Sequence, residues 1–134
     1  MAWNRKNKYN AKKTSIGGYT YDSKLEAAEA EQLELRKLTG EVSSFTRQHR
    51  LDLCVGGERI CMYKIDFRAE LTDGSIEYIE VKGLATDVWR IKWKLTQAMF
   101  EELTEGERAV LVLSKKDSRT IVLRNEAYLK STEK

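Results

Sequence analysis

Residues 63–83 read YKIDFRAELTDGSIEYIEVKG, two apolar stretches joined by the turn signal Thr72-Asp73-Gly74-Ser75. This pattern predicts two antiparallel strands linked by a tight turn. Asp66 lies on the first strand, and Glu80 and Lys82 lie on the second. Residues two apart on a strand face the same way, so Glu80 and Lys82 project together while Val81 points back into the core. Two carboxylates can hold a divalent cation, and a lysine beside them can position a water molecule.

The two carboxylates can share a cation only if the hairpin register places them on one face. A two-residue loop, Asp73-Gly74, would put Asp66 opposite Val81 and therefore on the wrong face. A three-residue loop, Thr72-Asp73-Gly74 with Gly74 at positive φ, puts Asp66 opposite Glu80. We therefore expect the three-residue loop, or a bulge nearby with the same effect.

The composition is that of one globular domain. The chain has 134 residues, of which 41% are hydrophobic and 34% charged, and no apolar run is long enough to cross a membrane. Without an apolar signal-peptide core at the N-terminus, the expected compartment is the cytoplasm. The two cysteines, Cys54 and Cys61, do not make a four-ligand zinc set and are expected to be free thiols. The single histidine, His49, excludes chemistry that needs two histidines, and its apolar strand face favours a structural role.

The remaining elements follow from periodicity and capping signals. A helix is expected from Asp22 or Ser23 to Leu38, with Leu25, Ala28 and Leu35 on its apolar stripe. Strands are expected at 49–55, 60–69, 75–82, 109–113 and 121–123, of which 109–113 is apolar enough to be buried on both faces. A second helix from Thr86 or Asp87 to Leu103 is expected, followed by a short helix from about Glu126. The core face of the second helix should carry five apolar side chains: Val88, Ile91, Leu95, Ala98 and Met99. The order predicts an α/β fold with a mixed central sheet flanked by helices.

The charge is unevenly distributed although the net charge is only +3. Residues 1–16 form a basic N-terminal arm before a single domain at 17–134. The arm has no acidic residue, and it carries two aromatic side chains and five basic ones: Arg5, Lys6, Lys8, Lys12 and Lys13. Basic residues interleaved with aromatics suit phosphate contact and base stacking, whereas a solubilising tail is the alternative.

With Asp66, Glu80-Val81-Lys82 and this order of elements, the chain resembles the PD-(D/E)XK nuclease superfamily. More narrowly, it is similar to small phage and prophage nucleases regarded as Holliday junction resolvase-like endonucleases. The narrower resemblance covers most of the chain at these positions: Lys12-Lys13, Tyr21-Asp22-Ser23-Lys24-Leu25-Glu26, Gln48, Asp66-Phe67, Glu80-Val81-Lys82-Gly83 and residues 90–94. Ile65 stands where the motif has a proline, which is not a ligand. The resemblance implies a restriction-endonuclease-like core with element order α-β-β-β-α-β-β.

The resemblance also implies roles for individual residues. Asp66 and Glu80 would ligate Mg²⁺ or Mn²⁺ together with the backbone carbonyl of Val81, and Lys82 would orient the attacking water or stabilise charge on the phosphate. Glu26 would complete the metal site, but Ser23-Lys24-Leu25-Glu26 also fits a capping box in which Glu26 reaches back to the Ser23 amide. Gln48 is a further site candidate.

The second helix offers Lys92, which lies inside the apolar arc and points toward the sheet. It would either face the phosphate or extend its stem over the core. Arg90 and Lys94 point away from the sheet and are candidates for DNA contact. Trp89 and Trp93 are expected to pack in the core rather than meet DNA.

The implied activity is hydrolysis of DNA phosphodiester bonds by a divalent-metal-dependent endonuclease, on branched or junction DNA in phage replication or recombination. The alternatives are an exonuclease or nicking enzyme of the same superfamily, and a nucleic-acid-binding module without catalysis. The expected partners are DNA and a second copy of the chain in a homodimer, with no membrane and no small-molecule cofactor. If the chain is phage- or prophage-encoded, it would act in the cytoplasm of a bacterial host.

Overall fold

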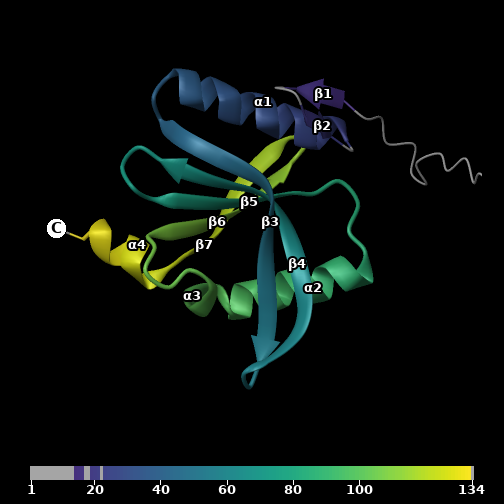
Figure 1. The fold of residues 1–134 in the computed structure, drawn as a ribbon, viewed down its shortest axis with the longest axis vertical. Helices are drawn as coiled ribbons and strands as arrows, with labels where there is room; N and C mark the ends of the chain where they lie inside the picture. Colours follow the sequence, from purple (N-terminus) through teal and green to yellow (C-terminus); the bar gives the residue numbers. More distant parts are fainter. Residues whose placement is uncertain (1–13, 17–18, 22, 134) are drawn as a thin grey trace, which may run out of the picture.

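The computed structural model describes residues 14–16, 19–21 and 23–133, which form an α/β fold with a five-stranded mixed sheet between helices (Figure 1). A small hairpin precedes it, in which β1 (Thr14–Ile16) pairs antiparallel with β2 (Tyr19–Tyr21). The last three residues assigned to the basic arm are therefore part of a strand. The five basic arm residues, numbers 5 to 13, lie outside the described residues.

The central sheet has the order β3-β4-β5-β6-β7. Its strands are β3 (Val42–Val55), β4 (Glu58–Leu71), β5 (Ile76–Val81), β6 (Ala109–Lys115) and β7 (Ser118–Arg124). Neighbouring strands are antiparallel except β5 and β6, which are parallel. A parallel pair needs a crossover connection, which α2 (Asp87–Ala98) and α3 (Phe100–Leu103) supply. The chain ends with α4 (Glu126–Ser131).

Two apolar clusters lie on the two faces of this sheet. The first packs α1 (Lys24–Leu38) against Phe67, Ile79 and Val112, and the second packs α2 and α3 against Ile65, Tyr78 and Leu111. Strand β6 contributes to both clusters, and its first four residues are buried. The expectation that this strand is covered on both faces is confirmed.

Helix α1 begins and ends where its capping residues predict. The Ser23 side chain accepts a hydrogen bond from the Glu26 amide at 3.2 Å, and Gly40 just beyond the helix has a φ of 85°. The expected apolar stripe was wrong in part. Leu25 packs against the cluster, but Ala28 and Leu35 are exposed, and the buried apolar residues are Ala27, Ala30 and Leu33.

Helix α2 is also rotated from its expected orientation. Val88 and Ile91, predicted for the core, are 62% and 61% exposed, and Ala98 is exposed as well. Trp93 and Thr96 are the buried residues of this helix, while Leu95 and the following Met99 lie at the core as expected. The large indole rings decide this orientation, because turning them to the sheet buries more apolar area than burying valine and isoleucine would.

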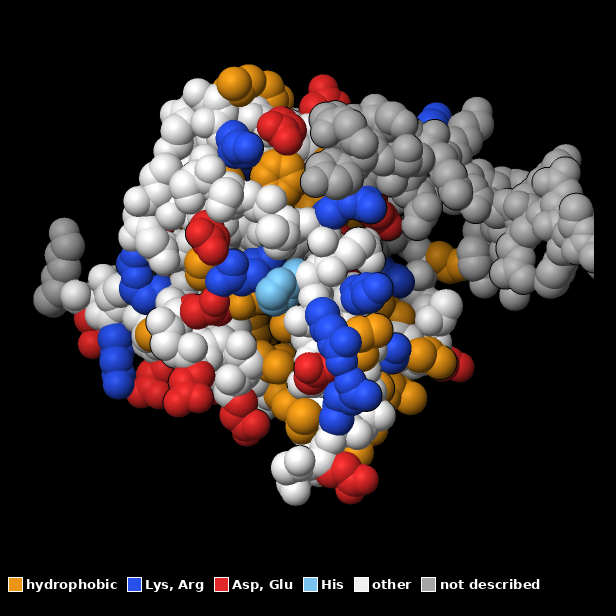
Figure 2. Space-filling model, viewed as in Figure 1, with side chains coloured by type: hydrophobic (Ala, Val, Ile, Leu, Met, Phe, Trp, Pro, Cys, Tyr) orange, Lys and Arg blue, Asp and Glu red, His pale blue; other side chains and the backbone are white. Residues whose placement is uncertain are grey.

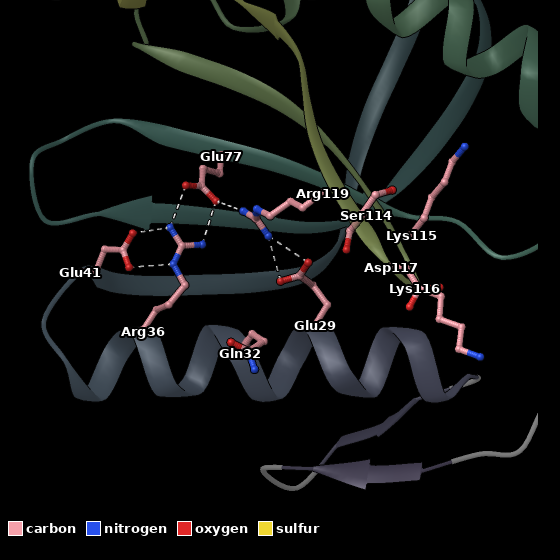
Figure 3. Close-up of a pocket in the computed structure, with 11 residues that line it drawn as sticks. Glu29, Gln32, Arg36, Glu41, Glu77, Ser114, Lys115, Lys116, Asp117 and Arg119 are labelled. Carbon is pink, nitrogen blue, oxygen red and sulfur yellow. Dashed lines mark hydrogen bonds and ion pairs between the residues drawn. The ribbon is translucent and has the colours of Figure 1, made fainter.

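Helix α1 is tied to the sheet by charges as well as by apolar packing (Figure 3). Arg36 donates to both carboxylate oxygens of Glu77 on β5, at 2.9 and 2.8 Å, and also pairs with Glu41. Arg119 on β7 bridges Glu77 and Glu29 from the other side. The network lines a pocket of about 620 Å³ between α1 and the β6–β7 hairpin. Because both arginines already pair with carboxylates, we interpret this ion-pair network, called the clamp below, as a structural link between α1 and the sheet.

We predict that Arg36→Met lowers the free energy of unfolding by about 1–3 kcal/mol, because it removes two charged hydrogen bonds from the largely covered carboxylate of Glu77. The side chains of Arg36 and Glu77 are only 17% and 13% exposed. Urea denaturation measures the change. Arg90→Met is the matched control, because its pair with Asp87 is exposed and should contribute less than about 0.5 kcal/mol. Equal losses of unfolding free energy in the two variants would contradict a stabilising role of the clamp.

Candidate functional site

The register of the β4–β5 hairpin is the one expected from the sequence. Phe67 pairs with Ile79 and Arg68 with Tyr78, and Gly74 has a φ of 88°. The Leu71 amide donates to the Ser75 carbonyl at 2.8 Å, which closes a three-residue loop. The three-residue loop is confirmed. Continued by one more pair, this register sets Asp66 opposite Glu80.

The carboxylates of Asp66 and Glu80 do meet, in a buried environment. Asp66 is 8% exposed and Glu80 is 5% exposed. The Asp66 amide donates to Oε1 of Glu80 at 3.3 Å, and the Val81 amide donates to Oδ2 of Asp66 at 2.8 Å. Each strand therefore supplies a backbone N–H to the acid on its neighbour. These donors partly satisfy two carboxylates that water hardly reaches.

Gln48 holds the other oxygen of Asp66, donating from Nε2 to Oδ1 at 3.3 Å. Its backbone has a φ of 54°, a left-handed conformation that costs a residue with a Cβ roughly 1–2 kcal/mol. It lies in β3 where the ladder to β4 passes from the Arg47–Phe67 pair to the His49–Ile65 pair. Strained backbone of this kind gathers at functional sites, and the structure brings this predicted candidate to the carboxylates.

Burial and the neighbouring charge of Glu80 raise the pKa of Asp66 from its ordinary 3.8 to about 8. The hydrogen bonds from Val81 and Gln48 act in the opposite direction but do not offset them. Burial, followed by the charge of Glu80, also raises the pKa of Tyr63, whose hydroxyl lies 3.2 Å from the indole nitrogen of Trp89. Two carboxylates this close are best satisfied by sharing a proton or a cation.

Trp89 contacts both members of the Glu-x-Lys pair. Its indole nitrogen donates to Oε2 of Glu80 at 2.7 Å, and the Nζ of Lys82 lies 4.5 Å from its ring centroid. Trp93 stacks behind it with a centroid distance of 5.4 Å. Glu80 and Lys82 thus project to one side of β5, as expected. The polar role of Trp89 was missed in the sequence, where an indole on an amphipathic helix reads as packing.

Glu26 is not brought to the pair as a third ligand. The Ser23 hydroxyl caps α1 by accepting a hydrogen bond from the Glu26 amide, which is one half of the predicted capping box. In the part of the chain that the structure describes, no three histidine, cysteine or acidic side chains gather as a metal site. The start of α1 does lie near the end of β5, because a Cβ on Gly83 would stand 3.4 Å from Leu25.

The helix α2 cations separate as expected. Lys92 points toward the sheet, but its Nζ donates to the Met62 carbonyl at 3.1 Å, so it satisfies a backbone acceptor at this position. Arg90 and Lys94 are exposed on the other side, and Arg90 pairs with Asp87. The ring of His49 lies 5.7 Å from that of Tyr78, and burial lowers the pKa of His49, so the packing expected for this side chain is confirmed.

The structure offers a metal the carboxylates of Asp66 and Glu80, and the resemblance adds the Val81 carbonyl as a third donor. All are oxygen atoms, the ligands preferred by Mg²⁺ and Mn²⁺, and Mg²⁺ is commonly held by only one or two carboxylates plus water and phosphate. A divalent cation would also relieve the repulsion that raises the pKa of Asp66. The donor set fits such an ion.

Comparison with known proteins assigns the chain to a family but not to an activity. Residues 6–115 match the family described as "Protein of unknown function (DUF1064)". No curated protein and no solved structure matches the chain. No helix within the described ranges is long and apolar enough to span a bilayer.

We predict that Asp66 destabilises the metal-free protein increasingly as the pH rises from about 4 to 8, and that Asp66→Asn removes this contribution. A carboxyl whose pKa is raised to about 8 binds its proton more tightly in the folded state, so its contribution to stability falls as pH rises through this range. The variant should exceed the wild type by about 1–3 kcal/mol at pH 8 and by little at pH 4. Urea denaturation in EDTA at both pH values measures the difference, and a pH-independent difference would contradict the buried pair.

Proposed function

The chain belongs to the DUF1064 family, and we propose that it is a divalent-metal-dependent DNA endonuclease on a restriction-endonuclease-like core. The observation that carries the proposal is the meeting of Asp66 and Glu80 in a buried pair with Lys82 beside them. A protein gains no stability from two adjoining carboxylates that repel each other. Such a pair is better explained by a task that needs an anionic oxygen cluster.

The roles of the residues follow from their placement. Asp66, Glu80 and the Val81 carbonyl would hold the ion, which when bound supplies Lewis-acid activation of water and neutralises charge on the phosphate. The Lys82 ammonium lies against the ring of Trp89, whose indole nitrogen donates to Glu80, so both side chains contact the same indole. The task of Lys82 is to orient the attacking water or to stabilise the charge that develops on the phosphate.

Gln48 and Trp89 act as positioning residues. Each donates a hydrogen bond to one carboxylate, and each thereby fixes the orientation in which that carboxylate presents its remaining lone pairs to an ion. Partners of this kind orient ligands and tune their basicity. The Trp93 ring behind Trp89 holds the indole in place.

The substrate is proposed from the resemblance of the sequence to phage junction nucleases. It is branched or Holliday-junction DNA, cleaved in phage replication or recombination in the cytoplasm of a bacterial host, and a homodimer would cut two strands symmetrically. Exonuclease or nicking activity on the same site, and nucleic-acid binding without catalysis, are the competing functions. Labelled junction, fork, linear duplex and single-stranded DNA, each with Mg²⁺, Mn²⁺ or EDTA, separate all three.

We predict that Asp66→Asn and Glu80→Gln each abolish Mg²⁺-dependent cleavage and weaken Mg²⁺ binding, because the ion loses a protein anchor. Lys82→Ala should retain Mg²⁺ binding but lose about 10²–10⁴-fold in rate. All three should still bind DNA. Cleavage, metal affinity and DNA affinity are measured in parallel.

Lys94→Ala is the control for loss of a lysine, since Lys94 is exposed on α2 and outside the carboxylate pair. It should cleave at nearly the wild-type rate at saturating DNA. Wild-type cleavage by either carboxylate variant would reject the assignment of the site. Loss of cleavage in Lys94→Ala equal to that in Lys82→Ala would remove the special role of Lys82.

We predict that Trp89→Phe lowers metal affinity about 10–100-fold, as loss of an outer partner of a ligand does. Phenylalanine keeps a ring under Lys82 but removes the N–H that holds Glu80. Isothermal titration with Mg²⁺ measures the change. Trp93→Phe makes the same substitution one turn along the helix and should leave metal affinity nearly unchanged, so similar losses in both variants would assign Trp89 to packing alone.

A further inference from the structure

The β3–β4 hairpin continues as a two-stranded ribbon beyond the edge of the neighbouring strand. The pairing of β4 with β5 runs over residues 67–70 of β4, whereas its pairing with β3 continues to the Gly56-Gly57 turn. Both glycines of that turn have positive φ, as a tight hairpin needs. Figure 1 shows the hairpin passing across α2 to a projecting tip.

The two faces of this ribbon differ in character. The inner face carries Leu51, Leu53, Tyr63 and Ile65, which pack with the residues of α2 and α3. By alternation the outer face carries Arg50, Asp52, Met62 and Lys64. Figure 2 shows lysine and arginine side chains gathered in a strip over this part of the molecule.

The outer face is built around two cations that oppose each other. Arg50 and Lys64 are direct cross-strand partners and both are exposed. Arg59 adds a third cation, and the acidic group that pairs with these cations is Asp52, 3.0 Å from Arg50 and 3.7 Å from Arg59. The four side chains therefore carry two net positive charges.

Opposed like charges on a sheet are destabilising, so this arrangement calls for a reason. Protection of the open β3 edge from aggregation is one, since charged side chains discourage edge pairing. Edge protection requires a charge of either sign on β3 and does not require a second cation facing it from β4. A polyanionic partner accounts for both cations, because its negative charge would offset their mutual repulsion when it binds.

The ribbon adjoins the carboxylate pair along the chain. Arg50 follows Gln48 by two residues, and Lys64 precedes Asp66 by two, which is about 7 Å along a strand. We propose that the outer face of the β3–β4 ribbon, with Arg50, Lys64 and Arg59, binds the phosphate backbone of duplex DNA in the neighbourhood of Asp66 and Glu80. The choice of DNA rests on the proposed function. The contacts are to phosphates and carry no base specificity.

The test is DNA binding in EDTA, where no cleavage occurs, by Arg50→Gln/Lys64→Gln. Fluorescence anisotropy with a labelled duplex over about 50–200 mM salt gives both the affinity and its salt dependence. The double variant should bind about tenfold or more weakly at the lower salt, and its log–log salt slope should flatten by up to about 0.9 for each lost contact. Arg124→Gln/Lys130→Gln is the matched control, because it removes the same charge from β7 and α4 at the opposite end of the sheet.

A second variant separates binding from folding. Lys64→Glu sets an acid opposite Arg50, which should raise the melting temperature while it weakens DNA binding. Wild-type affinity and salt slope in the double variant, or equal changes in the control, would overturn the proposal. Weakened binding to poly-glutamate with unchanged binding to DNA would overturn it too, in favour of an acidic protein. Failure of the nuclease proposal is seen separately, as cleavage that persists in Asp66→Asn.

Discussion

At Gln48 and Asp66 the side chains of the β3–β4 ladder exchange the faces of the sheet to which they point. This exchange, the turnover, organises the molecule. Phe45 packs on the α1 side of the sheet, whereas Leu51 and Leu53, at even spacing from it, pack on the α2 side. Residues at even spacing in a regular strand share one face, so the phase changes between them. On β4 the same change separates Phe67 from Ile65. The same two strands therefore pack against α1 along one part and against α2 along the other. Asp66 is buried where the change takes place.

The carboxylate pair is the part of this structure that folding by itself does not favour. Asp66 and Glu80 are buried side by side, and the left-handed backbone of Gln48 adds a further cost. Backbone amides, the Gln48 amide and the Trp89 indole offset some of it. Proteins depart from the rules of stability mostly at functional sites, which is why the proposed chemistry is assigned here rather than to the clamp around Glu77.

The clamp and the pair show how the same residue types serve different ends. Around Glu77 each carboxylate has an arginine, the charges compensate, and the network ties α1 to β5 and β7. At Asp66 and Glu80 the partners that donate hydrogen bonds are neutral N–H groups, so no arginine compensates the charge of the pair. The ribbon adds uncompensated positive charge at a short distance along the strands. The proposed nuclease function accounts for the pair and the ribbon together, through a metal ion and a phosphate backbone.

Local sequence determined the α/β class, the start of α1 at Ser23 and the three-residue loop at Gly74, because capping, turn chemistry and strand parity act within a few residues. It also indicated that Asp66, Glu80 and Lys82 belong together. Tertiary structure alone decided which face of α2 is buried, because Trp89 and Trp93 compete with Val88 and Ile91 for one sheet surface. It also decided that Lys92 donates to the Met62 carbonyl and that the Glu26 amide donates to the Ser23 hydroxyl at the start of α1. The turnover at Gln48 has no local signal, because a phase change in one strand is set by two helices that lie far apart in the chain.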